Sequence, residues 1–569
     1  MEWLLPLLTM FAPLAGSLAI WFFGREWGER SARVGIVALW CAAFSSVATF
    51  ILVLANGPMK LALIGEASGA LSYTILIDRL SSVMMMLISL VSLIIHVYSE
   101  RYMVGDQGYA RFFALVGSLT SVLLGLVTAG NVLWIFLYWH GVTWLLATLV
   151  AFQVTHRAAV SAGRRTFWVQ GLGDAAFGLA LVVLYKAYGT LDLADLGERL
   201  RTAPVLFSLG LGTDWQIEVP AVATLLLILS VMTKSAQFPL HVWLIGTLEA
   251  PTPVSALMHA GIVNAGGFLV NRLAPLFGQA PTTLHLLFVI GSVTALIGAA
   301  AMLTQPSVKR MLVYSTMGQM GYMVMECGLG AFALAVFHLC AHGLFKATLF
   351  LNSGANIHKA RTEFKLPPGM KRMASPPFSA MTWTTGLAVT LILPLVILLA
   401  LHGVVQIPLQ DGQGAVIFLF FGWVTASQAM FSLYRMQAGA SWKVSLTMLA
   451  ALALIGLTYL WAGEAFTHFL YPGPGEAMGY LQAAEWNRTL FALFVGCSAV
   501  LVLGAWGVIY GEAKGLTFLM PTWMESLRGA AYVAFLNGLY VEDFMRAVRR
   551  RVSGRFGQAT GVDAQGAGG

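Results

Sequence analysis

The stretch VFHLCAHGLFKATLF, residues 336–350, sets His338, His342 and Lys346 four residues apart in an otherwise apolar run. A helix rises about 1.5 Å per residue, so these three ionisable side chains would form one stripe roughly 12 Å long. Ionisable side chains are costly inside a bilayer, and by default they mark an ion or proton path. The alternative is that each group is satisfied separately by packing against other helices. The regular spacing favours a proton relay within a membrane.

The composition of the whole chain also indicates a membrane protein. Of its 569 residues, 58% are hydrophobic and only 10% are charged, whereas a typical soluble domain has about 25% charged residues. Apolar runs of about 20 residues recur, which is the length that crosses a hydrocarbon core of about 30 Å. The net charge of +8 therefore fits basic loops of a protein in a lipid bilayer, and it does not indicate a nucleic-acid partner.

The apolar runs predict an all-α polytopic membrane protein with about 14–15 transmembrane helices. Most loop Lys and Arg residues follow the odd-numbered runs, so those loops and the Arg-rich C-terminal tail are expected in the cytoplasm. The expected spans are residues 3–23, 34–55, 76–98, 112–129, 131–153, 167–187, 219–237, 254–273, 283–303, 311–329, 331–355, 379–402, 414–436, 444–462 and 488–511.

Two apolar segments are interrupted by a proline: SVMTKSAQFPLHVW breaks at Pro239, at the end of the seventh span, and VTLILPLVILLA breaks at Pro394 in the twelfth. Each proline alone could be an ordinary kink, but matching interruptions in two halves indicate an inverted-repeat transporter with broken helices 7 and 12. The predicted divisions are residues 1–111 with helices 1–3, 112–273 and 283–436 with the two inverted five-helix repeats, 444–511 with the last transmembrane helices, 512–555 as an amphipathic basic tail, and 556–569 as a disordered tail.

Further ionisable residues fall inside or beside the expected spans. Lys234 precedes Pro239 by five residues, and burial there favours a neutral amine that can exchange protons, although a lysine can also snorkel to the interface. The other candidates for the path are His140, Asp174, Glu249 and His259.

Three further residues have two readings each. Asp78 and Arg79, at the start of the third span, either form structural ion pairs with other helices or contribute to the path. Glu326 lies near a helix end, where exposure to water is as consistent as a role in the path.

The chain has no motif for a bound cofactor or metal. Its four cysteines are not spaced as CxxC, and neither GxGxxG after a strand nor GxxxxGK[ST] occurs. We therefore expect no catalytic chemistry on this chain alone, and any redox or hydration chemistry is expected on another subunit.

Several ordered strings resemble the antiporter-like subunits of respiratory complex I and of Mrp-type cation antiporters, above all the large L type. They are LIDRLSSVMM, the pair Gly173–Asp174, KSAQFPLHVWLIGTLEAPTPVSALMHA, KRMLVYSTMGQMGYM and FHLCAHGLFKATLFLNSG, within residues 70–355. The resemblance implies fourteen core helices with two inverted five-helix repeats. By position it implies that Lys234 is the central proton carrier, that Asp174 is a supporting acid, and that the linking relay is made of His259, His338, His342 and Lys346.

The departures from that family are equally specific. The string YWH places His140 where complex I subunits have a glutamate in GWE, IGTLE replaces PDAME, and TLILPLVILLALHG lacks the lysine of the twelfth helix. The chain also ends too soon after its last expected span for a long lateral helix.

These losses resemble the DabB-type subunits of bacterial inorganic-carbon uptake complexes. That resemblance implies a bacterial inner membrane and a cytoplasmic, zinc-containing DabA-like partner related to β-carbonic anhydrases. The pair would couple proton or cation flow to hydration of CO₂ to bicarbonate, with the zinc on the partner. The alternatives are a proton-pumping subunit of complex I or of a membrane hydrogenase, and an Mrp-type cation/proton antiporter subunit.

Overall fold

The computed structural model describes residues 3–65, 71–202, 206–208, 216–362, 461–473, 475–497, 499–500 and 522–547, with isolated positions 392, 396 and 454. Apart from those isolated positions and residues 461–462, the expected spans 379–402, 414–436 and 444–462 lie outside this part of the chain, as does Pro394. The expected tail at 556–569 also lies outside it.

Helices form nearly all of the described chain. They are α1 (Leu4–Trp27), α2 (Arg30–Asn56), α3 (Arg79–Tyr102), α4 (Tyr109–Thr128), α5 (Val132–Val150), α6 (Arg157–Tyr188), α7 (Leu193–Thr202), α8 (Val219–Lys234), α9 (Val242–Gly246), α10 (Thr252–Ala260), α11 (Ala265–Arg272), α12 (Ala274–Gly278), α13 (Pro281–Thr304), α14 (Val308–Gly328), α15 (Phe332–Thr362), α20 (Glu476–Ala483) and α22 (Thr522–Leu536). Within the described ranges, nine helical segments are long and apolar enough to cross a membrane, which confirms an all-helical polytopic membrane protein.

The remaining regular elements are short. The 3₁₀ turns are η1 (Thr247–Glu249), η2 (Ile262–Asn264) and η6 (Gly538–Tyr540). Strand β1 (Met59–Ile64) pairs antiparallel with β2 (Tyr73–Ile77), and β3 (Leu206–Ser208) pairs antiparallel with β4 (Gln216–Glu218). Both hairpins lie in connections between helices, and β2 packs against the α4–α5 connection, where the Gly130 N–H donates to the Thr74 carbonyl at 2.8 Å.

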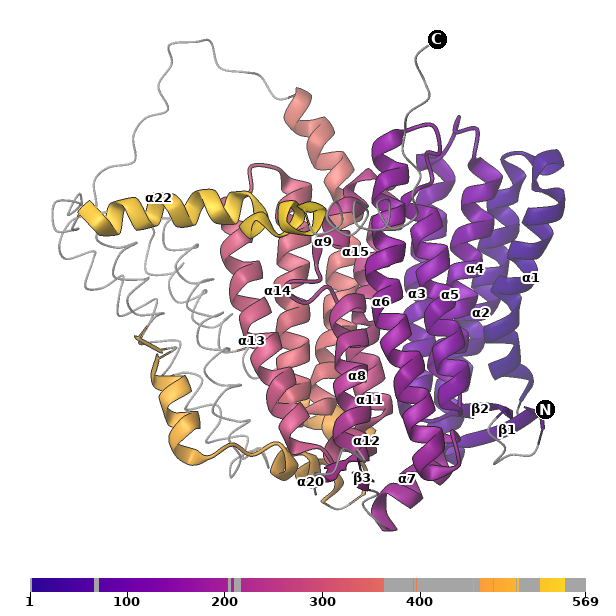
Figure 1. Cartoon of the computed structure of the whole chain (residues 1–569). Coiled ribbons are helices and arrows are strands. Elements are labelled where there is room, and N and C mark those ends of the chain that lie inside the picture. Colours follow the sequence, from indigo (N-terminus) through magenta and orange to yellow (C-terminus); the bar gives the residue numbers. More distant parts are fainter. Residues whose placement is uncertain are drawn as a thin grey trace, which may run out of the picture.

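The long helices run alternately up and down the bundle, so alternate connections meet at the same end (Figure 1). The end at which α22 lies receives the α1–α2, α3–α4 and α5–α6 connections, and β1, β2, α7, α12 and α20 lie at the opposite end. We call the α22 end the basic end, because most lysines and arginines near the ends of the described helices belong to connections and turns at that end, among them Arg30, Arg111, Arg157, Arg164 and Lys309, whereas Lys60 of β1 and Arg199 and Arg201 of α7 belong to the opposite end.

The expected break in the seventh span occurs earlier than its proline. Helix α8 ends at Lys234, Ala236 has a positive φ of 48°, and α9 begins only at Val242. Pro239 has no backbone N–H to donate to the Ser235 carbonyl, and its ring would clash with that carbonyl in a continuous helix, so α8 ends about one turn before the proline. The Ser235 hydroxyl donates to the Val263 carbonyl at 2.6 Å, and the backbone N–H of Phe238 donates to the Thr294 hydroxyl at 3.1 Å.

The eighth span is also interrupted. Helix α10 ends at Ala260, and the 3₁₀ turn η2 separates it from α11. The Asn264 amide donates to the Ala260 carbonyl at 2.8 Å and so occupies one of the freed backbone acceptors. Gly343 of α15 lies beside this interruption, and a Cβ atom there would collide with the Ala260 carbonyl oxygen. The glycine therefore lets α15 approach the break closely.

Small residues bring α13 and α14 into backbone contact. A Cβ atom at Gly291 or Gly298 of α13 would collide with the backbone of α14, and one at Gly321 of α14 would collide with that of α13. Such small-residue contacts let membrane helices pack without a hydrophobic driving force between them. The packing fixes α14 against α13 on one side, so that its polar side chains can face α15 on the other.

Candidate ion-conducting site

Lys234 lies at the C-terminal end of α8 and is completely buried. Its ammonium donates to the Thr143 hydroxyl at 2.6 Å, to the Trp139 carbonyl at 3.1 Å and to the Gln170 side-chain oxygen at 3.2 Å. The nearest carboxylate oxygen is Asp174 Oδ1, at 3.6 Å. A buried charge needs both a counter-charge and hydrogen bonds, and the residues of α5 and α6 supply both.

Asp174 of α6 connects Lys234 to the outside of the bundle. Its second oxygen accepts from the Thr143 hydroxyl at 2.8 Å and lies 2.8 Å from His140 Nδ1. The Trp144 indole donates to His140 Nε2 at 3.0 Å, so a neutral imidazole with its proton on Nδ1 satisfies both contacts. The imidazole is 42% exposed. Thus Asp174 is the residue beside Lys234, and His140 lies one contact further out.

A second cluster lies between α14 and α15. Lys346 is almost completely buried, and its ammonium donates to the Ser315 hydroxyl at 2.8 Å and to the Leu312 carbonyl at 3.4 Å. Across the described part of the chain, Lys346 has no carboxylate within ion-pair distance.

His338, two turns earlier on α15, is the residue that meets a carboxylate. Its Nδ1 lies 3.1 and 3.2 Å from the two oxygens of Glu326, and its Nε2 lies 2.9 Å from the side-chain oxygen of Gln319. Both ring nitrogens therefore face acceptors, which suits the charged imidazolium. Glu326, which sequence reasoning left between exposure and function, is buried against His338.

His259 and His342 form the polar part of the contact between α10 and α15. Both are buried, and none of their ring nitrogens has a hydrogen-bond partner among the residues that the structure describes. The His259 ring stacks on Phe350, with centroids 4.2 Å apart, and the His342 ring lies 6.2 Å from that of His338. Such orphaned nitrogens are expected where water molecules complete a buried polar network.

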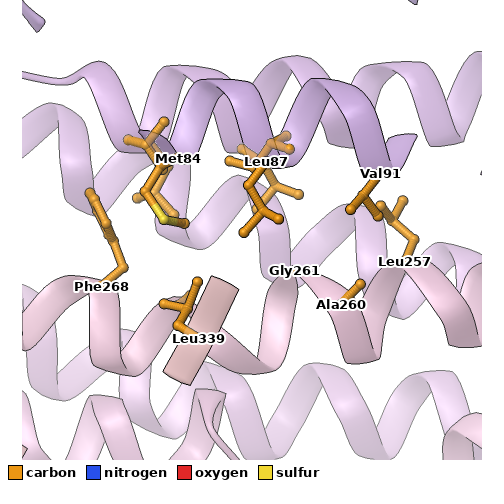
Figure 2. A pocket seen from close by; sticks show the side chains of 13 residues that line it. Met84, Leu87, Val91, Leu257, Ala260, Gly261, Phe268 and Leu339 are labelled. Atoms are coloured by element: carbon orange, nitrogen blue, oxygen red, sulfur yellow. The ribbon is translucent and has the colours of Figure 1, made fainter. Parts of the chain in front are cut away.

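An apolar pocket lies next to these histidines but is a different kind of space. Figure 2 shows Met84, Leu257, Phe268 and Leu339 around it, with Gly261 at the interruption of the eighth span. A void with this lining offers no partners to water, so a hydrated ion is not expected to pass through it. An aqueous connection between the two lysine clusters would therefore follow the histidines rather than this pocket.

The residues at the start of α3 make structural contacts. Asp78 accepts from the Arg272 guanidinium at 2.5 and 3.3 Å, and Arg272 also donates to the Ser81 hydroxyl at 2.6 Å. Burial alone would raise the pKa of the Asp78 carboxyl, but Arg272 and the bonds from Ser81 outweigh it and hold that pKa below its ordinary value. Arg79 instead donates to the Phe469 carbonyl at 2.6 Å.

Glu249 lies outside both lysine clusters. It is exposed on η1, and its carboxylate is 3.6 Å from His156 Nδ1 in the α5–α6 connection. Among all the residues that the structure describes, no three His, Cys, Asp or Glu side chains are arranged to hold a metal ion.

Sequence reasoning missed the neutral members of both clusters. They are Thr143, Gln170, Ser315 and Gln319, all of which lie in apolar spans. Their spacing was a usable signal, because Gln170 precedes Asp174 by four residues and Ser315 precedes Gln319 by four, which places each pair on one helix face.

Two family descriptions match the chain. Residues 129–402 match the transmembrane family described as NADH:quinone oxidoreductase/Mrp antiporter, and residues 66–113 match the N-terminal region described as complex I chain 5. Both lysine clusters fall within the first match.

Individual relatives cover more of the chain. A protein of Halothiobacillus neapolitanus named as probable inorganic carbon transporter subunit DabB1 is 39% identical over 520 residues, which is 89% of each chain. NAD(P)H-quinone oxidoreductase chain 5 of Synechocystis is 32% identical over 77% of this chain and 65% of its own length.

Two solved structures show the same fold. A chain of the Mrp complex from Dietzia superposes with a TM-score of 0.65 over 98% of this chain and 60% of its own, at 20% identity. A chain of the archaeal membrane-bound sulfane sulfur reductase superposes with a TM-score of 0.54 over 84% of this chain and 74% of its own, at 19% identity. At these identities the likeness shows the fold alone.

Proposed function

Because this chain belongs to the antiporter-like membrane subunits shared by complex I and Mrp antiporters, we propose that it conducts protons, or another cation, for a complex that hydrates CO₂. The observation that carries this proposal is the relative named as an inorganic carbon transporter subunit, which matches 89% of both chains. The oxidoreductase relative matches only 65% of its own length. The match to the carbon-transporter subunit therefore extends over more of both chains than the match to this oxidoreductase chain.

The proposed architecture extends beyond the described helices. It has 14–15 transmembrane helices with two inverted five-helix repeats. The interrupted segment of α8 and α9 is the broken helix of the first repeat. The basic end lies in the cytoplasm of a bacterial cell, because Lys and Arg gather on that side of membrane proteins. A cytoplasmic DabA-like partner carries the zinc and the hydration chemistry.

In this proposal the two lysine clusters are the ends of a proton path. Lys234 binds and releases a proton beside the Asp174 carboxylate. Lys346 binds and releases one where its described hydrogen-bond partners are the neutral oxygens of Ser315 and Leu312. His338, His342 and His259 lie between the α14–α15 cluster and the interrupted eighth span, and water at the orphaned nitrogens would join them.

The test is growth of a carbonic-anhydrase-deficient bacterium in ambient air. This chain with a DabA-like partner should restore growth and bicarbonate accumulation, and neither protein should do so alone. Accumulation by this chain alone would contradict the proposal. Proton-coupled Na⁺ transport by the chain in vesicles, without CO₂ dependence, would instead support an Mrp-type antiporter subunit, a function consistent with the family match over residues 129–402.

A further inference from the structure

A groove on the outer surface of the bundle lies over the last turns of α5 at the basic end. It has a volume of about 390 Å³ and is lined by residues of α4, α5, the α5–α6 connection and α6. Pockets that hold small organic ligands typically measure about 300–1,000 Å³. The lining residues that decide its chemistry are Arg111, Trp144, Thr148, Arg164 and Phe167.

The two arginines give the groove a positive end. Arg111 lies in the first turn of α4, where its guanidinium donates to the Phe152 carbonyl at 2.5 Å and lies 4.5 Å from the centre of the Phe152 ring. These contacts hold one edge of the guanidinium and leave its other donors for a ligand. Arg164 of α6 is exposed and forms no ion pair within the described ranges, whereas its neighbour Arg165 pairs with Glu542 at 2.7 Å.

The rest of the groove is apolar and aromatic. Trp144 is 57% exposed, and it lies about 9 Å along the helix axis from the end of α5, so it is placed toward the hydrocarbon side of the two arginines. The Phe167 ring packs edge-on against it, with centroids 5.2 Å apart. A basic end followed by an aromatic wall matches an amphiphile with an anionic head and a hydrocarbon tail.

We propose that this groove binds one anionic phospholipid, with its phosphate at Arg111 and Arg164 and an acyl chain along Trp144. Its charge complementarity selects the occupant, because a membrane neighbour with a neutral surface would leave two guanidinium groups without a counter-charge. Trp144 also donates to His140, so the lipid would form the outer boundary of the Lys234 cluster.

The direct test uses the full chain in micelles with phosphatidylglycerol that carries a photoreactive group in its acyl chain. After irradiation, mass spectrometry should find the label on residues 144–167. The double variant Arg111→Gln, Arg164→Gln should lower that labelling roughly thirtyfold, because each arginine near an anionic headgroup contributes about a factor of five. The matched control is the double variant Arg30→Gln, Arg157→Gln, which removes the same two charges from exposed positions at the basic end outside the groove and should label like the unchanged chain.

A second variant tests the acyl chain separately from the charge. Thr148 is exposed on the floor of the groove, so Thr148→Phe should fill it without disturbing the packed core, and labelling should fall while both arginines remain. Labelling that is equal in the double variant and the control would overturn the proposal. So would displacement of the label by inorganic phosphate as effective as by unlabelled phosphatidylglycerol, or a photo-crosslinker at position 148 that joins a membrane protein in place of lipid in the native complex.

Discussion

Lys234 and Lys346 are both buried lysines of one membrane bundle, yet among the residues that the structure describes only Lys234 has a counter-charge beside it. Asp174 lies 3.6 Å from Lys234, whereas the ammonium of Lys346 meets a hydroxyl and a carbonyl. The carboxylate of the second cluster, Glu326 of α14, instead meets His338, which lies two turns of α15 away from Lys346. The first cluster therefore keeps its positive and negative charges in contact, and the second separates them along a helix.

The comparison shows that one bundle can bury two lysines in different electrostatic surroundings. A charge with a partner at contact distance is tolerated in a low dielectric, while one with only neutral partners is tolerated less and becomes neutral more readily. Variants that remove or move one charge should therefore act differently on the two clusters.

The largest effect is expected at the centre of the first cluster. Lys234→Ala should abolish CO₂-dependent bicarbonate accumulation while the complex still assembles, because no other ammonium lies beside Asp174 in the described structure. Lys234→Arg should fail as well, since a guanidinium does not release its proton at accessible pH. Full activity of the arginine variant would show that position 234 needs only a fixed charge.

The next largest effect tests the contact pair itself. Asp174→Asn leaves the Lys234 charge without its counter-charge and should lower the free energy of unfolding by about 3–5 kcal/mol. Thermal unfolding in nanodiscs measures this, and the double variant Asp174→Asn, Lys234→Met should lose less than the sum of the single changes.

A matched control for Asp174→Asn exists at the end of the bundle opposite the basic end. Asp192 is also buried and pairs with Lys60 at 2.8 Å, outside either lysine cluster. Asp192→Asn should lower stability but leave ion conduction intact. Equal loss of conduction in both asparagine variants would mean that stability, not the Lys234 pair, limits activity.

A smaller effect is expected in the second cluster. Glu326→Gln leaves His338 between two neutral acceptors, and conduction should fall about tenfold, the worth of one hydrogen bond to a charged group. Proton flux into vesicles measures it. A loss as complete as that of Lys234→Ala would show that the two clusters do not differ as proposed.

The smallest effect is expected at the exposed edge. His140→Glu adds a negative charge beside Asp174, which holds the proton on Lys234 more firmly, so the pH optimum of coupled transport should shift upward by less than about one unit. His140→Gln, which adds no charge, is the control. An unchanged optimum at normal protein levels would make His140 a packing residue.

Much of the fold could be predicted because hydropathy is a local property. Each of the first eleven expected spans falls on one or two helices of the structure. The end of α8 about one turn before Pro239 agrees with the missing backbone donor of that proline. The bonds from Ser235 to Val263 and from Phe238 to Thr294 could not be predicted, because they join the segment after the break to residues distant in the sequence.

The site divides in the same way. The stripe of His338, His342 and Lys346 follows from helical periodicity alone. That Glu326 is buried against His338, and that Asp174 separates His140 from Lys234, depends on which helices are neighbours. Residue type and spacing identify the ionisable groups, whereas helix packing determines which of them are in contact.

The contact between Arg79 and the Phe469 carbonyl has a consequence for biosynthesis. The two residues are 390 positions apart, and a ribosome that adds about 5–20 residues per second needs roughly 20–80 s to make that length. Throughout that time the start of α3 is in the membrane without this partner, although Arg272, 194 positions after Asp78, becomes available about halfway through. The start of α3 therefore acquires its tertiary contacts in two steps during synthesis, first with Arg272 and later with the Phe469 carbonyl.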